Sequence, residues 1–150
     1  MDYIIQLLMA FLGSLGFGAL YNTHGRKLFL AALGGLVAWA VYLLVDQFTD
    51  SPYPCAFLAS VALTLYSEVM ARWKKTPVTV FLVTSAIPLI PGAGLYRSVS
   101  AMMLRDVAKA TTQSSYTVLF AASMAAGITF TTLLVRLILN RAHEFHHKHS

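Results

Sequence analysis

Charged residues are scarce in this sequence, and their scarcity excludes most soluble architectures. Only 11% of the 150 residues are Asp, Glu, Lys or Arg, whereas 57% are hydrophobic. Soluble domains carry roughly 25% charged residues, so this chain has too few polar side chains to cover a globular surface in water. Together with a mean hydropathy of +0.66, this shortage predicts that lipid surrounds most of the protein.

Cysteine and the motifs of enzyme active sites are also missing. The single Cys55 excludes an intrachain disulfide and a CxxC metal motif, and no neighbouring base identifies it as a nucleophile. The sequence has no glycine-rich phosphate loop and no HExxH motif, and no histidine is placed to activate Ser85 or Ser98. We therefore expect neither an enzyme nor a bound cofactor.

Acidic residues are too few to balance the basic ones: 6 Asp and Glu against 11 Lys and Arg give a net charge of +5. A nucleic-acid-binding protein would gather these cations in a patch or along one face. Here they form short clusters between apolar runs, a pattern typical of residues that set membrane topology. We expect no nucleic acid among the partners.

Long apolar runs are what the sequence has in quantity. Because a spanning helix needs about 20 mostly apolar residues, we predict an all-α, polytopic membrane helix bundle with about five transmembrane helices. The first run follows no positively charged segment, so we interpret it as a retained span and not as a signal peptide. The transmembrane domain would cover residues 1–140, with spans near 3–21, 28–45, 55–71, 78–104 (broken at 88–94) and 115–136.

The charges between these runs predict the orientation in the membrane. Basic residues mark the turns at 22–27 and 72–77 as cytoplasmic, whereas the loop at 46–54 carries two aspartates and no base. The N-terminus would then lie outside and the C-terminus in the cytoplasm. Arg105 and Lys109 oppose this scheme, because it places both of them outside.

A proline- and glycine-rich segment at residues 88–94 interrupts the fourth run. Each proline removes a backbone donor and clashes with the preceding turn, and the glycines permit conformations that other residues avoid. Inside a membrane such a break is tolerated only within protein or around a wet cavity, and broken helices form the substrate sites of many transporters. We hypothesise that Pro88, Pro91, Gly92 and Gly94 form a substrate-binding or gating element.

Arg97 lies within a predicted helix of mixed polarity at residues 95–110, shortly after the break. A charge inside the membrane is costly, and the planar arginine fork fits a carboxylate. Our hypothesis is that Arg97 and the backbone N–H groups at 92–95 receive the anionic group of a small anion or zwitterion. The alternative places residues 88–94 at the membrane surface and Arg97 on an interfacial amphipathic helix.

Glu68 is an ionisable residue near the end of the third span. Its spacing of four residues from Arg72 predicts an ion pair at a helix end, and a role in proton coupling is the alternative.

The basic tail at 141–150 contains residues of the types that bind metals: His143, Glu144, His146, His147 and His149. Because no ligands elsewhere would complete a geometry, we expect a solvated tail and no metal site.

Small residues recur four positions apart within the spans, as in Ser14 with Gly18 and Ser123 with Gly127. Helices in lipid associate by close backbone approach, which small side chains permit. The pattern predicts tight packing inside the bundle, and an interface with a partner subunit is the alternative.

The order of these features resembles the threonine/serine exporter family. The chain is most similar to the short split subunit that corresponds to the C-terminal half of the full-length exporters. The matching features are a glycine-rich first span, an Asn-x-x-x-Arg turn, a basic loop after the third span, and the motif P-x-x-P-G-x-x-x-Y/R before the last span.

This resemblance implies a bacterial inner-membrane protein that pairs with a larger subunit carrying the other half of the fold. It also implies proton-coupled export of small polar metabolites, either threonine- or serine-like amino acids or a dicarboxylate such as succinate. A homo-oligomer would be another way to supply two halves. The alternative function is a non-transporting scaffold or assembly partner of a larger membrane protein.

Overall fold

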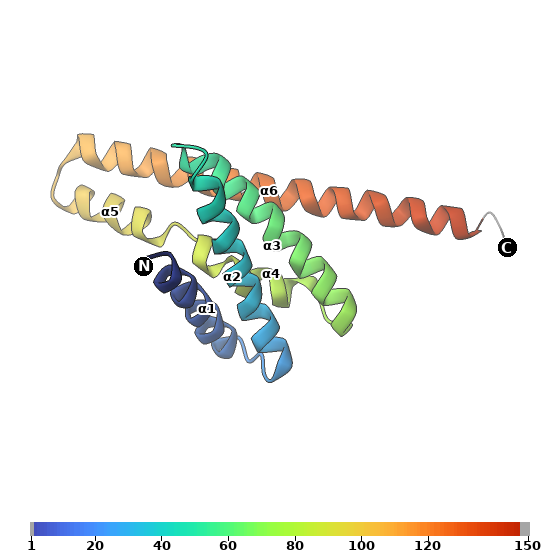
Figure 1. Cartoon of the computed structure of the whole chain (residues 1–150). Helices are drawn as coiled ribbons and strands as arrows, with labels where there is room; N and C mark the ends of the chain where they lie inside the picture. Colours follow the sequence, from blue (N-terminus) through green and yellow to red (C-terminus); the bar gives the residue numbers. More distant parts are fainter. Residues whose placement is uncertain (1, 148–150) are drawn as a thin grey trace.

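The computed structural model describes residues 2–147 and, among these, the side chains of residues 3–141. Its helices are joined by short turns (Figure 1). Their bounds are α1 (Asp2–Leu20), α2 (Arg26–Asp46), α3 (Pro52–Lys74), α4 (Val78–Ala86), the 3₁₀ turn η1 (Ile87–Leu89), α5 (Gly92–Met103) and α6 (Val107–His147). The prediction that the tail binds no metal concerns His143, Glu144, His146, His147 and His149, whose side chains lie outside the described residues.

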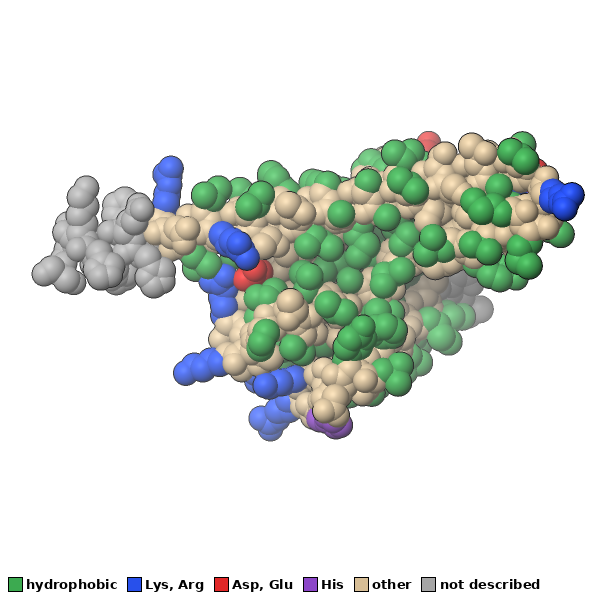
Figure 2. Space-filling view, turned by 180° about the vertical axis from the view of Figure 1, so that it is seen from behind, with side chains coloured by type: hydrophobic (Ala, Val, Ile, Leu, Met, Phe, Trp, Pro, Cys, Tyr) green, Lys and Arg blue, Asp and Glu red, His purple; other side chains and the backbone are tan. Residues whose placement is uncertain are grey.

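The predicted all-α polytopic bundle is confirmed for the described residues. Four helices are long and apolar enough to cross a membrane, and α4 with α5 forms a further candidate span that is bent by 54°. Apolar side chains cover the middle of the molecule, and Lys and Arg gather at its ends (Figure 2). The larger basic group surrounds the α1–α2 and α3–α4 turns, and the smaller one lies at the tip of the α5–α6 hairpin.

Helix α2 lies at the centre and packs against α1, α3 and α4, while α6 packs along α3 and α5. Glycines sit where these helices meet. A Cβ atom added at Gly35 would collide with the Ser14 hydroxyl, and one at Gly127 would lie 2.6 Å from the carbonyl oxygen of Phe57. The small residues therefore allow the close backbone approach on which helix association in lipid depends.

The prediction of one helix over residues 95–110 is wrong. Helix α5 ends at Met103 and α6 begins at Val107, after a turn in which Arg105 has a φ of 56°. Asp106 starts the new helix because its Oδ1 accepts a hydrogen bond from the backbone N–H of Lys109 at 3.1 Å, as N-cap carboxylates do. The chain consequently reverses, and α5 and α6 form an antiparallel hairpin.

Helix α6 is longer than a membrane span requires. Its 41 residues correspond to about 61 Å at 1.5 Å per residue, about twice the thickness of the hydrocarbon core. It continues past both ends of the span expected at 115–136, and its C-terminal part leaves the bundle on the side of the α3–α4 turn (Figure 1).

Candidate functional site

Two prolines shape the break between α4 and α5. Pro88 lies in the 3₁₀ turn η1, and Ile90 after it is extended. Pro91 has φ −76° and ψ 54°, an inverse γ-turn in which the N–H of Gly92 donates to the carbonyl of Ile90 at 2.7 Å. Because neither proline has an N–H to donate, the first helix ends here and α5 starts in a new direction.

The two glycines of the break differ in role. Both lie in α5, and neither has a positive φ, so the unusual conformation suggested by the sequence is not used. A Cβ added at Gly94 would lie 2.5 Å from Thr117 Oγ1 on α6, whereas one at Gly92 would meet nothing within 4 Å. Gly94 therefore permits close packing of α5 on α6, and Gly92 is sterically open.

Protein encloses the break on the side of α1 and α2. Pro88 Cγ would lie 3.3 Å from a Cβ added at Gly35 on α2. Pro88 also borders a hollow of about 280 Å³ together with Trp39 and Gln6, whose side chains are joined by a hydrogen bond of 3.2 Å. Protein therefore covers the break on this side, whereas Ile90 and Gly92 are exposed on the other.

Arg97 lies about one and a half turns into α5 and lines a different cavity from Pro88. This cavity has a volume of about 290 Å³ and lies along the α5–α6 hairpin. Its polar lining side chains are Tyr96, Arg97, Ser100, Asp106 and Lys109. We call it the outer cavity, after the side on which the predicted orientation places the hairpin turn.

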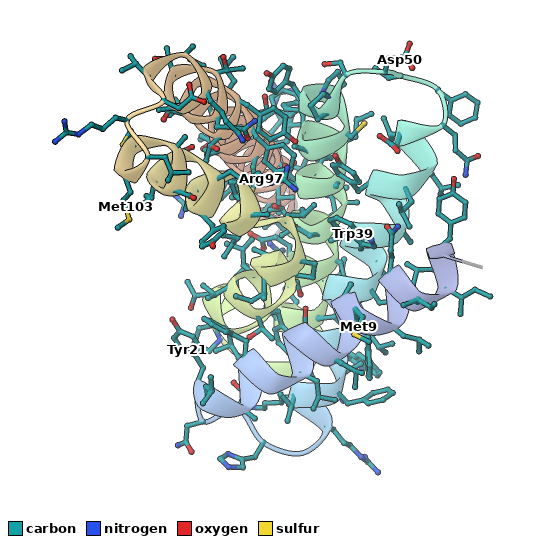
Figure 3. The ribbon with its side chains drawn as sticks, turned by 90° about the vertical axis from the view of Figure 1, so that its left-hand side faces the viewer. Met9, Tyr21, Trp39, Asp50, Arg97 and Met103 are labelled. Atoms are coloured by element: carbon teal, nitrogen blue, oxygen red, sulfur yellow. The ribbon has the colours of Figure 1, made fainter. Side chains whose placement is uncertain are left out.

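Figure 3 shows where Arg97 lies relative to the ends of the bundle. Asp50 and Tyr21 mark opposite ends, and Arg97 lies at a level between them, on the side of α5 that faces the other helices. Arg97 is exposed in the structure, so its guanidinium group is accessible to a solute in the outer cavity, where it can form charge-assisted hydrogen bonds.

Three charges line the outer cavity without pairing with one another. Arg97 and Lys109 are cationic and Asp106 is anionic, and the one ion pair among the described residues is Glu68 with Arg72. A guanidinium fork can bind a carboxylate at two points, and a carboxylate can accept from an ammonium group. The cavity therefore suits a small zwitterion, whereas a dianion would be attracted by the cations and repelled by Asp106.

Sequence reasoning identified Arg97 and missed Asp106 and Lys109. Both were assigned to the interior of a helix, although an aspartate followed by helix-forming residues is a common N-cap signal. Recognising that cap would have predicted the hairpin, which brings the start of α6 beside α5. Two of the N–H groups proposed as anion donors are already used, since Gly92 donates to Ile90 and Leu95 donates to Pro91.

The predicted ion pair of Glu68 is confirmed. Arg72 Nη2 lies 2.9 Å from Glu68 Oε2, and Glu68 is only 9% exposed. The pair occupies the last turns of α3, beside the α3–α4 turn. A role of Glu68 in proton coupling stays a prediction.

A family model described as "Threonine/Serine exporter, ThrE" matches residues 6–134. The match covers the helix break, the outer cavity and most of α6. No curated protein and no solved structure matches the chain significantly.

Proposed function

The chain belongs to the threonine/serine exporter family, and on this premise we propose that it is a subunit of a secondary exporter of small polar metabolites. The observation that carries the proposal is the outer cavity, where Arg97, Lys109 and Asp106 lie together on the hairpin that follows the broken helix. The candidate substrates are threonine- or serine-like amino acids and dicarboxylates such as succinate.

In this proposal Arg97 receives the substrate carboxylate and Asp106 receives the ammonium group. Asp106 uses Oδ1 to cap α6, and its second oxygen is available to a cation in the cavity. Lys109 adds a positive charge that draws anionic groups toward the site. This mixture favours an amino acid over a dicarboxylate, because a second carboxylate would have to lie near Asp106.

The break at Pro88 and Pro91 would act as the gate. Broken helices allow the two half-helices to change their angle while the substrate site stays near the middle of the membrane. The 54° bend between α4 and α5 supports this role. So does the free space around Gly92, where an added Cβ would meet nothing within 4 Å. Close packing of Gly94 on Thr117 would make α5 move together with α6.

Location and assembly belong to the same proposal. We place the protein in the bacterial inner membrane with its N-terminus outside and its C-terminus in the cytoplasm, because the larger basic group surrounds the α1–α2 and α3–α4 turns (Figure 2). A complete alternating-access transporter commonly contains two related halves. The other half would come from a larger subunit or from a second copy of this chain.

Counterflow into proteoliposomes tests the proposal. Labelled serine, threonine and succinate are offered to the chain alone and to the chain with its larger partner. Replacing Arg97 by Ala removes a charge-assisted interaction worth about 1.5–3 kcal/mol, so uptake at low substrate concentration should fall about 10- to 150-fold. Arg105→Ala is the matched control, because this exposed arginine lies on the same hairpin and does not line the outer cavity.

Asp106→Asn separates the two classes of substrate. Asparagine is as good an N-cap as aspartate, so α6 should keep its start while the cavity loses its negative charge. Uptake of an amino acid should then weaken, whereas uptake of a dicarboxylate should improve. A stable complex that takes up none of the three solutes would instead support the alternative function of a membrane scaffold.

A further inference from the structure

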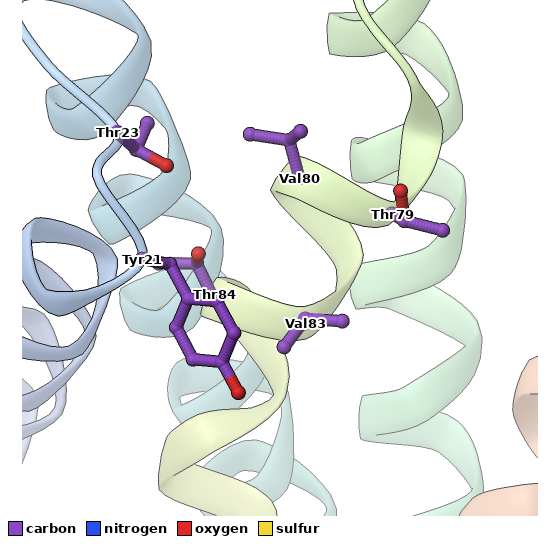
Figure 4. A pocket seen from close by; sticks show the side chains of 6 residues that line it. All are labelled: Tyr21, Thr23, Thr79, Val80, Val83 and Thr84. Atoms are coloured by element: carbon purple, nitrogen blue, oxygen red, sulfur yellow. The ribbon is translucent and has the colours of Figure 1, made fainter.

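A further cavity, which we call the inner cavity, lies at the other end of the broken span, between the α1–α2 turn and α4 (Figure 4). Its volume is about 240 Å³. The lining residues are Tyr21, Thr23, Thr79, Val80, Val83 and Thr84. Because α4 lines this cavity and α5 lines the outer one, the two halves of one bent span each border a cavity, with the break between them.

The chemistry of this inner cavity differs from that of the outer one. It has four hydroxyl groups and two valine side chains, and none of its lining residues carries a formal charge. In Figure 4 the hydroxyls of Thr23 and Thr84 point into the space between the turn and α4. Such a lining suits a small group that combines a hydroxyl with an apolar carbon.

Thr23 and Thr84 are buried residues whose hydroxyl oxygens lack a protein partner among the described residues. Thr84 is 2% exposed and Thr23 is 9% exposed, and neither side chain has a hydrogen bond within the described part of the chain. Most other buried hydroxyls bond to the carbonyl four residues earlier in their own helix, as those of Ser67 and Thr131 do. Among the described side chains, Ser14 Oγ is the one oxygen that is both fully enclosed and without a partner. The oxygens of Thr23 and Thr84 are therefore accessible from the cavity that both residues line, and each can donate to and accept from a bound molecule.

Helix α1 fixes the direction of the Thr84 hydroxyl. A Cβ added at Gly18 would lie 2.9 Å from the Thr84 methyl carbon and 3.7 Å from its oxygen. The methyl group is therefore the part of Thr84 that packs against α1. The Thr23 side of the cavity is held by the N–H of Thr23, which donates to the carbonyl of Gly18 at 3.0 Å.

From this arrangement we propose that the inner cavity binds the hydroxyalkyl side chain of the substrate on the cytoplasmic side of the break. The proposal rests on the exporter function above and adds a site that recognises the side chain instead of the charged groups. Thr23 and Thr84 exchange hydrogen bonds with the substrate hydroxyl, and Val80 and Val83 contact its carbon atoms. A solute without the hydroxyl leaves both threonines unpaired and binds more weakly.

Protection of an introduced cysteine tests this site without relying on transport. Val83 lines the inner cavity and is 40% exposed, so Val83→Cys should react with a hydrophilic maleimide. The reaction is followed in sonicated membranes of the source organism, where any partner subunit is present and both membrane faces are accessible. The unsubstituted chain, whose Cys55 is buried, gives the background.

Threonine should slow the labelling of Val83→Cys, and it should do so at about tenfold lower concentration than 2-aminobutyrate, which lacks only the hydroxyl. Adding Thr84→Val keeps the packing against Gly18 and should remove this preference. His24→Cys is the control, because His24 is exposed in the same turn and does not line the cavity. Its labelling should not respond to either solute.

Several outcomes overturn the proposal: no protection by threonine, equal protection at His24, or a preference that survives Thr84→Val. If the exporter function is wrong and the inner site is right, threonine protects Val83→Cys from labelling while counterflow is absent. Counterflow without protection would reject the inner site and leave the exporter function standing.

Discussion

Gly127 on α6 is the position where the fold predicts the largest effect of adding one methyl group. A Cβ there would lie 2.6 Å from the carbonyl oxygen of Phe57 and 2.6 Å from Ser60 Oγ, both on α3. Since one of these atoms belongs to the backbone, a change of rotamer cannot relieve the contact. Gly127→Ala must therefore push α3 and α6 apart.

The size of the effect follows from that distance. Ordinary van der Waals contact begins at 3.4 Å, so the helices must separate by about 0.8 Å, which forfeits a quarter to a half of the attraction of the contacts nearby. If about 40 atom pairs contribute 0.1–0.2 kcal/mol each, the loss is about 1–4 kcal/mol. A loss of about 2 kcal/mol would lower Tm by about 4–8 °C in a chain of this size.

Thermal unfolding of the purified protein in mild detergent measures this change. Gly13→Ala is the matched control, because a Cβ at Gly13 on α1 meets nothing within 4 Å. The control should leave Tm unchanged or raise it slightly, since alanine favours helix more than glycine does. If Gly127→Ala proves as harmless as Gly13→Ala, the close approach of α3 and α6 does not exist in the folded protein.

Four further predictions concern substitutions of single side chains, each measured by the same unfolding assay. Ser14→Ala should be neutral or stabilising because its buried hydroxyl has no partner among the described residues, whereas Ser85→Ala should cost about 1 kcal/mol through loss of its hydrogen bond to α2. Lys75→Gly should stabilise by about 1 kcal/mol, since Lys75 ends α3 with a φ of 48°; an unchanged Tm would argue against this left-handed cap. Glu68→Gln should lower stability by no more than about 1 kcal/mol because its partner Arg72 is half exposed. Counterflow should persist in Glu68→Gln, and loss of uphill export alone would assign Glu68 to proton coupling.

The four long helices could be predicted from sequence because each contains an apolar run that lies next to polar turns or a polar tail. Their ends were less predictable, since a helix need not stop where the hydrocarbon stops. Helix α3 runs from Pro52 to Lys74 although its apolar run covers residues 55–71, because proline is accepted in a first turn and basic residues suit a last turn. Hydropathy gives the apolar part of such a helix and not its full length.

The candidate site was only partly predictable for a different reason. Arg97 was identified because a charge beside a helix break is conspicuous in an apolar sequence. Asp106 and Lys109 carry ordinary charges at a helix start, and only the reversal of the chain brings them beside Arg97. Thr23 and Thr84 have no distinguishing pattern at all, since most buried threonines in this fold bond to their own helix, as Thr64 and Thr131 do.

Side-chain hydrogen bonds between helices connect α1, α2, α3 and α4, but none of those described connects these helices to the α5–α6 hairpin. Among the described side chains, each hydrogen bond that joins two helices has one partner on α2. Trp39 of α2 donates to Gln6 of α1. The α2 carbonyls of Leu30 and Ala31 accept from Tyr66 of α3 and Ser85 of α4, respectively. The α5–α6 hairpin is attached to this unit by the break and by apolar and small-residue contacts along α3. Packing contacts of this kind can slide by small steps, whereas a buried hydrogen bond must be broken outright. A rearrangement of the hairpin against α1 to α4 therefore breaks no side-chain hydrogen bond of the described structure, and the proline-rich break is the point about which such a movement would turn.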